Sequence, residues 1–357
     1  MKSSLIRFFT FATAMVSFAY LPIFARDLGI SDVNIGIIVA FYSSALFFSS
    51  YIFGRTSDKY GRKLFILVGL IAAIISFFLQ IFANDFTTLL LVRTLVGFCI
   101  GIYPSALVAY VYERKENLNR FASFGSLGWF FGLLISGIVA MYFTINGVFI
   151  LSSLFSLISF LVALFLESKK HKPISVPFFP IKIIKKNRCV YSCFFLRHTG
   201  AAMIWTFWPL YLLELGADLF WVGIIQAINS IVQFFVMYIV TEKFKSIKLV
   251  RYGILLSIIA FFSFTLARNF WEIIPTQFLL GISWGFLYVG VLRNLTDKNV
   301  EKATVSGILD SVINFATVIG PFLATLVISF GDYRTTMYVA SFLSLASFLI
   351  FNFSGKK

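Results

Sequence analysis

Apolar residues fall into twelve long stretches along the chain, separated by short polar segments. We expect each stretch to form a membrane-crossing helix, because about 20 consecutive apolar residues span the hydrocarbon core of a bilayer. The first stretch has no small-residue cleavage site after it and leads directly into the next, so we interpret it as a retained helix rather than a signal peptide. The predicted spans are 6–26, 34–53, 64–83, 88–112, 121–143, 147–167, 189–213, 218–240, 250–267, 271–292, 304–330 and 333–353.

The pattern also repeats, with every matched position shifted by 187 residues. Such an offset, unbroken over about thirty positions, indicates a duplicated unit rather than a chance match, and secondary transporters commonly have this architecture. We therefore predict an all-α membrane protein of two pseudo-symmetric six-helix bundles, at 1–167 and 189–357, joined by a cytoplasmic linker at 168–188. The matched positions are Pro22, Gly29 and the segment GIIxA from Gly36, against Pro209, Gly216 and the segment from Gly223.

Composition supports a protein whose main solvent is lipid. Apolar residues make up 59% of the chain, charged residues 13%, and the mean hydropathy is +0.92. A soluble domain of this length could not bury so much apolar surface, whereas helices in a bilayer pair their backbone polar groups internally.

The formal charge of +15 follows from topology. Of the 30 lysines and arginines, 25 lie in segments on one side of the predicted bilayer, and the opposite loops carry only Arg26, Arg268 and Arg334. This bias places both termini in the cytoplasm and the chain in the cytoplasmic membrane as a multi-pass protein. A nucleic-acid surface would need a soluble basic domain, and residues 168–188 are too short to form one. They are either a solvated connection or a contact to anionic membrane lipids.

The positions of the three cysteines do not predict a disulfide framework. Cys99 lies in the fourth predicted span, and Cys189 and Cys193 lie one turn apart at the start of the seventh. No disulfide set is implied, and no nearby histidine or carboxylate completes a metal site. We predict neither metal nor cofactor.

The sharpest local motif is GRTSDKYGRK, between the second and third spans. The glycines allow a tight turn and close helix approach, the aspartate can meet a cation or a helix N-terminus, and the last two cations face headgroups. The motif resembles the G-x-x-x-D-[RK]-x-G-R-[RK] loop of the major facilitator superfamily; an ordinary basic loop is the alternative. The residues this resemblance implies as a gating loop are Gly54, Asp58, Gly61, Arg62 and Lys63.

Further matches extend the resemblance over nearly the whole chain, closest in pattern to the prokaryotic drug/proton antiporter-like branch. Arg93 with Gly97 and Gly101 resembles an exporter pattern, and a glycine series in the fifth span resembles the exporter hinge, although the proline expected after its central glycine is missing. Gly320-Pro321 lies in the eleventh span instead. The candidate hinge or packing residues are Gly97, Gly101, Gly125, Gly128, Gly132 and Pro321.

The resemblance implies alternating access without covalent chemistry. Two six-helix halves would rock about a central site and expose it to one side at a time. Asp58 would help to hold the outward-facing state by pairing with Arg62 or Arg114 and by meeting the N-terminus of the eleventh helix.

Four ionisable residues lie well inside predicted spans, away from the span ends, namely Arg93, Arg197, His198 and Asp310. Each carries an insertion cost of about 2.5 to 3.5 kcal/mol, so each is either bonded within one half or involved in handling substrate or protons. Asp310 is the only acid well inside a span and is the first candidate for a proton carrier. It lies about 9 Å from the helix end, so a place in the cytoplasmic gate is the alternative. His198 is the other titratable candidate.

Polar and aromatic residues share helix faces with these groups. They either line a substrate cavity or form bonds between helices. The candidates for the substrate or proton pathway are Trp205, Gln226, Asn229, Gln233, Trp284, Tyr288 and Asn314.

Three functions remain open on these residues. The first is proton-coupled export of small, largely apolar or cationic organic compounds. The second is uptake of an organic anion or sugar-like metabolite, which Arg93, Arg197 and His198 would suit. The third is a membrane sensor of the same fold without transport. An enzyme is disfavoured, because the chain has only two histidines and His171 lies in the linker. We expect a monomer that meets small molecules, protons and lipids, and no nucleic acid.

Overall fold

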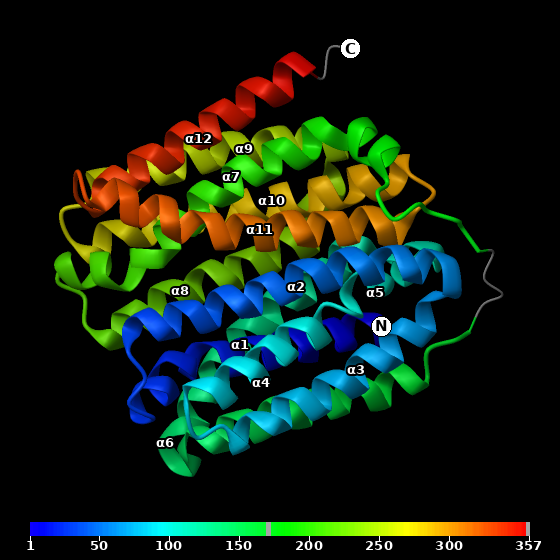
Figure 1. Cartoon of the computed structure of the whole chain (residues 1–357). Helices are drawn as coiled ribbons and strands as arrows, with labels where there is room; N and C mark the ends of the chain where they lie inside the picture. The colour runs from blue at the N-terminus through cyan, green and yellow to red at the C-terminus, as the bar shows by residue number, and fades with distance from the viewer. Residues whose placement is uncertain (169–172, 355–357) are drawn as a thin grey trace. The chain divides into compact units, whose positions relative to one another are not determined.

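The computed structural model describes residues 1–168 and 173–354, and the described chain is helical without a β-strand (Figure 1). Short turns of other helix types are η1 (Gln80–Phe82), η2 (Val236–Val240), η3 (Thr241–Lys243) and η4 (Phe270–Glu272). The α-helices are α1 (Lys2–Asp27), α2 (Asp32–Tyr60), α3 (Arg62–Leu79), α4 (Phe86–Ile100), α5 (Pro104–Glu113), α6 (Leu118–Leu164), α7 (Ile181–Glu214), α8 (Leu219–Phe235), α9 (Ser246–Leu266), α10 (Ile273–Lys298), α11 (Lys302–Ile328) and α12 (Tyr333–Ser354).

Backbone contacts group the chain into two compact units. Unit 1 consists of Met1–Phe179 and Asn299–Asn314, and unit 2 of Pro180–Lys298 and Phe315–Lys357. The first half of α11 therefore belongs to unit 1, although the rest of the same helix belongs to unit 2. Helix α7 begins at Ile181, so the last residues of the segment expected to be a linker are helical.

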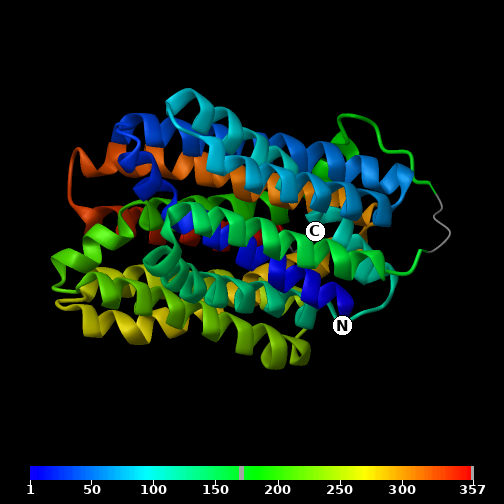
Figure 2. The ribbon, with the colours of Figure 1, turned by 90° about the horizontal axis from the view of Figure 1, so that it is seen from below.

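Helix α6 contains both the fifth and the sixth predicted spans. In a straight helix Gly128 and Ser152 would lie about 36 Å apart, yet both meet α1 at positions only about 8 Å apart along that helix. Gly128 packs against the carbonyl of Phe8, and the Thr13 hydroxyl donates to the Ser152 carbonyl at 3.3 Å. The chain therefore reverses within α6, as Figure 2 shows. The assigned helix corresponds to two antiparallel spans.

The fourth predicted span is divided, which the sequence analysis did not anticipate. Helix α4 ends at Ile100, and α5 starts at Pro104 after a turn of three residues. Proline lacks the backbone N–H that an unbroken helix would need at this point, and it is well suited to the first turn of a new helix. The predicted span 88–112 therefore consists of two helices, and Phe86–Glu113 taken together is long and apolar enough to cross a membrane.

The duplication is confirmed by the backbone at the ends of α1 and α7. Gly29 and Gly216 both have a positive φ, of 73° and 84°. Each glycine N–H donates to the carbonyl three residues earlier, at 2.8 Å from Gly29 and 3.0 Å from Gly216. The following helices begin alike, because Ser31 caps the Asn34 N–H and Asp218 caps the Trp221 N–H. All these positions differ by 187.

Small residues bring helices of unit 1 into backbone contact. A β-carbon on Gly97 would clash with the carbonyl of Tyr42 in α2, and one on Gly101 would lie 2.7 Å from the Ser49 β-carbon. Gly132 is equally close to α1, where a β-carbon would lie 2.8 Å from the Ala12 carbonyl oxygen. These glycines act as packing residues in α4, its C-terminal end and α6.

Among the described residues, nine helical segments are long enough and apolar enough in composition to cross a membrane. Helix α1, the first limb of α6 and α7 occupy the other three predicted positions.

Candidate functional site

Helix α2 and the first half of α11 lie against each other within unit 1. The Ser311 hydroxyl donates to the Phe47 carbonyl at 2.9 Å at one end of this contact. Towards the C-terminal end of α2, a β-carbon on Gly54 would lie 2.7 Å from the Ala303 carbonyl oxygen and 2.9 Å from the Gly307 α-carbon. The two backbones can therefore touch only because Gly54 and Gly307 lack side chains.

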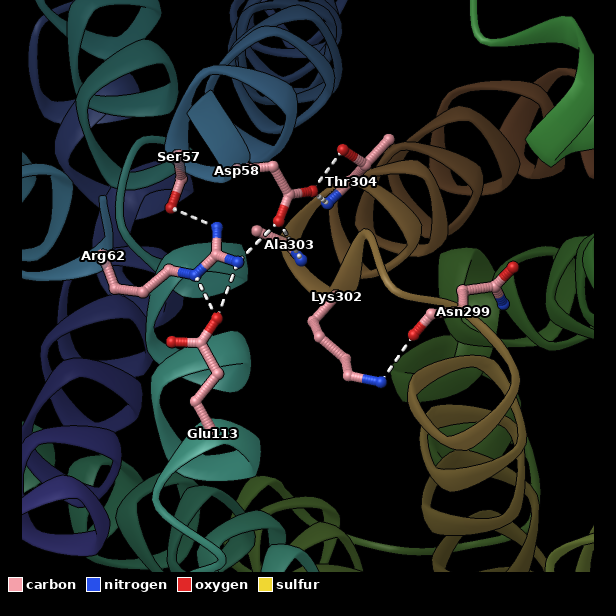
Figure 3. A network of polar contacts seen from close by, with 8 residues as sticks. All are labelled: Ser57, Asp58, Arg62, Glu113, Asn299, Lys302, Ala303 and Thr304. Atoms are coloured by element: carbon pink, nitrogen blue, oxygen red, sulfur yellow. Dashed lines mark hydrogen bonds and ion pairs between the residues drawn. The ribbon is translucent and has the colours of Figure 1, made fainter. Parts of the chain in front are cut away.

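Asp58 lies one turn beyond Gly54 and is completely buried. Its Oδ2 accepts the Thr304 N–H at 2.7 Å and also the Thr304 hydroxyl, and its Oδ1 accepts the Ala303 N–H at 3.3 Å (Figure 3). These two N–H groups lie in the first turn of α11, where no carbonyl of the same helix can accept them. The carboxylate thus caps the positive end of the α11 dipole.

Arg62 supplies the opposite charge. Its Nη2 lies 2.7 Å from Asp58 Oδ1 and 2.8 Å from Glu113 Oε1, and its Nε donates to the same Glu113 oxygen at 3.0 Å. Arg62 is only 4% exposed. A buried ion pair is tolerated when its remaining donors and acceptors are satisfied, as they are here by Glu113 and the α11 backbone. We name Asp58, Arg62, Ala303 and Thr304 the latch.

Of the two arginines expected near Asp58, the structure places Arg62 there. Arg114 instead forms an ion pair with Glu167. Gly61 has a φ of 105° and connects α2 to α3, which sets Arg62 at the first position of α3. Lys63, expected to face headgroups, donates to the Leu164 carbonyl at 3.0 Å.

The segment after α6 packs along the C-terminal end of α2. The Ile174 N–H donates to the Asp58 backbone carbonyl at 2.9 Å. The Tyr51 hydroxyl donates to the Phe178 carbonyl, and the Arg55 guanidinium carbon lies 5.2 Å from the Phe178 ring centre. The described part of the predicted linker thus contacts α2 and is not wholly solvated. His171 lies outside the described residues.

Arg93 is held inside unit 1 by neutral groups. Its Nη1 donates to the Ser17 hydroxyl at 2.7 Å and to Gln80 Oε1 at 2.8 Å, and its guanidinium carbon lies 4.7 Å from the Tyr42 ring centre. Arg93 forms no ion pair with a described residue and is 1% exposed. It therefore bonds α1, η1 and α2 together, which was the structural alternative to a pathway role.

Asp310 also lies in unit 1. The Ser105 hydroxyl donates to its Oδ2 at 3.4 Å. The charged group that acts on Asp310 electrostatically is Arg7 of α1, not Arg62, which is engaged in the latch. The Arg7 side chain is 5% exposed, and its guanidinium carbon lies 3.9 Å from the Phe11 ring centre.

In unit 2, four predicted residues of α7 and α10 come together. His198 lies 5.3 Å from Trp284 between ring centres, and Trp284 stacks on Tyr288 at 5.6 Å with 17° between the planes. The Arg197 guanidinium carbon lies 5.3 Å from the centre of Trp284. The structure thus brings the aromatic rings of α10 next to the cation of α7. The sequence could assign each residue to a helix face but could not show that the two faces meet.

The polar candidates of α8, namely Gln226, Asn229 and Gln233, form hydrogen bonds within α8 and to α10. Gln233 Nε2 donates to Asn229 Oδ1, and Asn229 Nδ2 donates to the Gln277 carbonyl at 3.4 Å. The carbonyl of Gln226 accepts the Ser230 hydroxyl at 3.4 Å within α8. These bonds are of the interhelical and local kind that the sequence analysis kept as an alternative to a cavity.

The remaining candidates lie on α7 and α11. Trp205 packs on Trp208, with 5.3 Å between ring centres, in an apolar cluster of unit 2. Asn314 is half-buried on α11, and Pro321 lies inside the same helix, where its carbonyl accepts the Thr325 hydroxyl at 3.0 Å.

Three residues of these networks were missed by the sequence analysis. Glu113 ends the apolar run of the fourth predicted span, and Gln80 is a lone amide near the end of the third. Arg7 follows Leu5 and Ile6 and precedes two phenylalanines, an apolar setting that could have indicated burial. Among the described residues there is no group of three or more histidines, cysteines or acids that could hold a metal ion.

A family model for the Major Facilitator Superfamily matches residues 3–303. The chain belongs to the major facilitator superfamily. The predicted resemblance and fold class are confirmed, and the chain is a multi-pass membrane transporter of small molecules rather than an enzyme. The twelve predicted spans are consistent with this family.

Relatives cover nearly the full length of this superfamily member. The multidrug resistance protein MdtG of Proteus mirabilis is 25% identical over 93% of the chain and 89% of the relative. The quinolone resistance protein NorA of Staphylococcus aureus is 20% identical over 92% of the chain and 89% of the relative. The crystal structure of the human organic anion transporter MFSD10 (TETRAN) shares the fold, with a TM-score of 0.81 and 15% identity over 98% and 99% of the two chains.

Proposed function

We propose that this transporter exports small organic compounds across the cytoplasmic membrane by alternating access, driven by protons, with both termini in the cytoplasm. The observation that carries the proposal is the latch. Two relatives named for multidrug and quinolone resistance support the direction of transport.

The latch suits a two-state transporter. It joins the α2–α3 turn, which belongs to the first sequence repeat, to the start of α11, which belongs to the second. Any motion that separates these two elements breaks hydrogen bonds to a buried carboxylate, and the bonds reform when the elements meet again. The contact is therefore either made or broken, which gives two discrete states rather than a continuum.

Asp310 is the candidate for the proton-binding group. It lies on α11 two turns beyond the latch residue Thr304, beside Ser105 and within the electrostatic reach of Arg7. In the proposed cycle, substrate or proton binding near Asp310 changes the balance between the latched and unlatched states. A ligand shifts such an equilibrium only by its difference in affinity for the two states.

A second candidate function is transport of an organic anion. The observation that favours it is that Arg93 and Arg197, both buried, form no ion pair with a described residue. The human protein of the same fold is titled an organic anion transporter. In this alternative, the buried arginines attract the solute through charge-assisted hydrogen bonds.

The test is accumulation of fluorescent lipophilic cations in efflux-deficient cells that express the chain, with and without a protonophore. Export predicts lower accumulation that the protonophore restores, and Asp310→Asn should abolish the effect. Asp297→Asn, at an exposed acid near the end of α10, is the matched control and should retain it. Equal accumulation in all cells, with the protein confirmed in the membrane, would refute cation export, and solute binding without flux in either direction would point to a sensor.

A further inference from the structure

We propose that Arg197, His198 and Trp284 of unit 2 form a binding platform for a planar aromatic carboxylate. The proposal rests on the second candidate function, transport of an organic anion, because it identifies the class of anion for which this surface is built. It selects against the lipophilic cations that an aromatic-rich transporter would otherwise be expected to prefer.

Arg197 has hydrogen-bond donors that no described residue accepts. Its Nε donates to the Ser257 hydroxyl at 2.7 Å, and that hydroxyl passes a hydrogen bond on to the Gly253 carbonyl at 2.9 Å. The two outer nitrogens of the guanidinium bond to none of the described residues. A guanidinium that is 2% exposed and has four unpaired N–H groups in a fork matches a carboxylate in shape and charge.

His198 adds a further donor beside this fork. Its Nδ1 is buried without a hydrogen-bond partner among the described residues, whereas Nε2 is not sealed and also makes no bond to them. A neutral imidazole carries one proton, and on Nδ1 that proton would be buried with no acceptor. We therefore place it on Nε2, where an incoming acceptor can reach it.

The aromatic part of the ligand has a surface to stack on. His198 lies between Phe194 and Trp284, with 5.7 Å and 5.3 Å between ring centres and the planes tilted by 32° and 33°. Phe194 is fully buried, but His198 and Trp284 are partly exposed. Aromatic rings at such separations prefer offset stacking, so a flat ring that covers the exposed part of His198 and Trp284 extends the same arrangement.

Charge decides between an anion and a cation. Aromatic side chains attract a cation when no other positive charge occupies the site. Here the Arg197 guanidinium already lies over Trp284 at 5.3 Å and over Phe261 at 5.1 Å, and Arg197 has no acidic partner among the described residues. An approaching cation would meet uncompensated like charge in a region of low dielectric constant, whereas a carboxylate would neutralise it.

Two probes that share one ring system test the inference. We suggest titration calorimetry of the purified full-length protein with 2-naphthoate and with 2-naphthylmethylammonium. Naphthoate should bind and the ammonium should not. Arg197→Met should weaken naphthoate binding about 10- to 100-fold, the range for loss of a hydrogen-bonded charge pair, and Trp284→Leu about tenfold. The exposed Arg251→Met and Trp271→Leu are the matched controls and should retain the wild-type affinity.

Thermal stability separates binding from a merely structural role. A buried charge without an ionic partner does not stabilise the fold, so Arg197→Met should unfold at the wild-type temperature or higher while binding is lost. A lower unfolding temperature with unchanged naphthoate affinity would overturn the proposal, as would equal binding of both probes. If Arg197→Met does not fold, Arg197→Lys and Trp284→Leu decide in its place, and wild-type affinity in both would refute the platform. Cation export without naphthoate binding would refute this inference alone and leave the proposed export intact.

Discussion

Asp58→Asn tests the latch most directly. The wild-type carboxylate accepts the N–H groups of Ala303 and Thr304 and pairs with Arg62 at 2.7 Å. Asparagine removes the charge and one acceptor oxygen, and its amide directs N–H groups towards neighbours that are themselves donors. The substitution therefore removes the partner of a buried cation and the cap of α11 in one step.

The magnitude follows from the contacts that differ between the latched and unlatched states. The ion pair between Asp58 and Arg62 lies on the α2–α3 side in both states, so the difference between the states comes from the hydrogen bonds of Asp58 to Ala303 and Thr304. A hydrogen bond to a charged group contributes about 1.5 to 3 kcal/mol. A loss of about 3 kcal/mol changes the ratio of latched to unlatched molecules about 100-fold.

Hydrogen–deuterium exchange with mass spectrometry measures this change at the atoms concerned. The amides of Ala303 and Thr304 lie in the first turn of α11 and are protected by Asp58, whereas the Val305 amide donates to the Glu301 carbonyl at 3.0 Å. Asp58→Asn should accelerate exchange of the first two amides about 100-fold, while opening of the rest of the helix changes little. Transport per protein molecule should fall, with abundance nearly intact.

Unchanged exchange of these two amides in Asp58→Asn would refute the reasoning, because nothing else described accepts them. Asp297→Asn, an exposed acid just before the same turn, should leave exchange at wild-type rates. Faster exchange in that control would mean that any loss of negative charge loosens the helix, and the latch would not be specific.

Two further changes probe neighbouring features. Gly54→Ala places a β-carbon 2.7 Å from the Ala303 carbonyl oxygen, so it should reduce transport as Asp58→Asn does. Gly36→Ala is the control and should transport normally, because its β-carbon would have nothing within 4 Å. Equal transport rates in the two variants would contradict the argument that α2 and α11 need glycine to approach closely. At the other end of the bundle, hydrogen bonds from the Thr88 backbone and hydroxyl lower the pKa of Asp85. Its cap is therefore fully effective above the ordinary pKa of about 4 and is lost as the pH falls through the lowered value, so the difference in unfolding temperature between wild type and Asp85→Ala should shrink between about pH 6 and about pH 3. A constant difference would show that ionisation of Asp85 does not stabilise the helix.

Much of the fold could be predicted because membrane helices are recognised from the length and apolar composition of their sequence, and because the repeat has a fixed offset. Gly29 and Gly216 even have the same backbone conformation. The break before Pro104 was missed because apolar residues continue across it. Hydropathy measures preference for lipid and does not register a turn of three residues.

The site was less accessible from sequence than the fold. The motif pointed to Asp58 and Arg62, since its spacing belongs to one loop. Glu113 completes the network from a helix some fifty residues later, and pairing across that separation depends on how helices pack. Arg7 was not singled out because a cation near a terminus is typical of a solvent-facing segment, although its guanidinium contacts the rings of Phe11 and Phe121. The partners of Arg93, Ser17 and Gln80, could not be predicted either, because they lie on other helical segments.

The residues of the latch are not repeated at the offset of 187. At the offset of 187, Asp58 corresponds to Lys245 and Thr304 corresponds to Asn117, so the second copy has a cation where the first has its carboxylate. A lysine is repelled by the positive end of a helix. One latch of about 3 kcal/mol is offset by a solute that binds the unlatched state about 100-fold more tightly, whereas two would require about 10,000-fold. Because one loop has diverged, the difference in binding free energy needed to open the latch lies within the range of an ordinary small molecule.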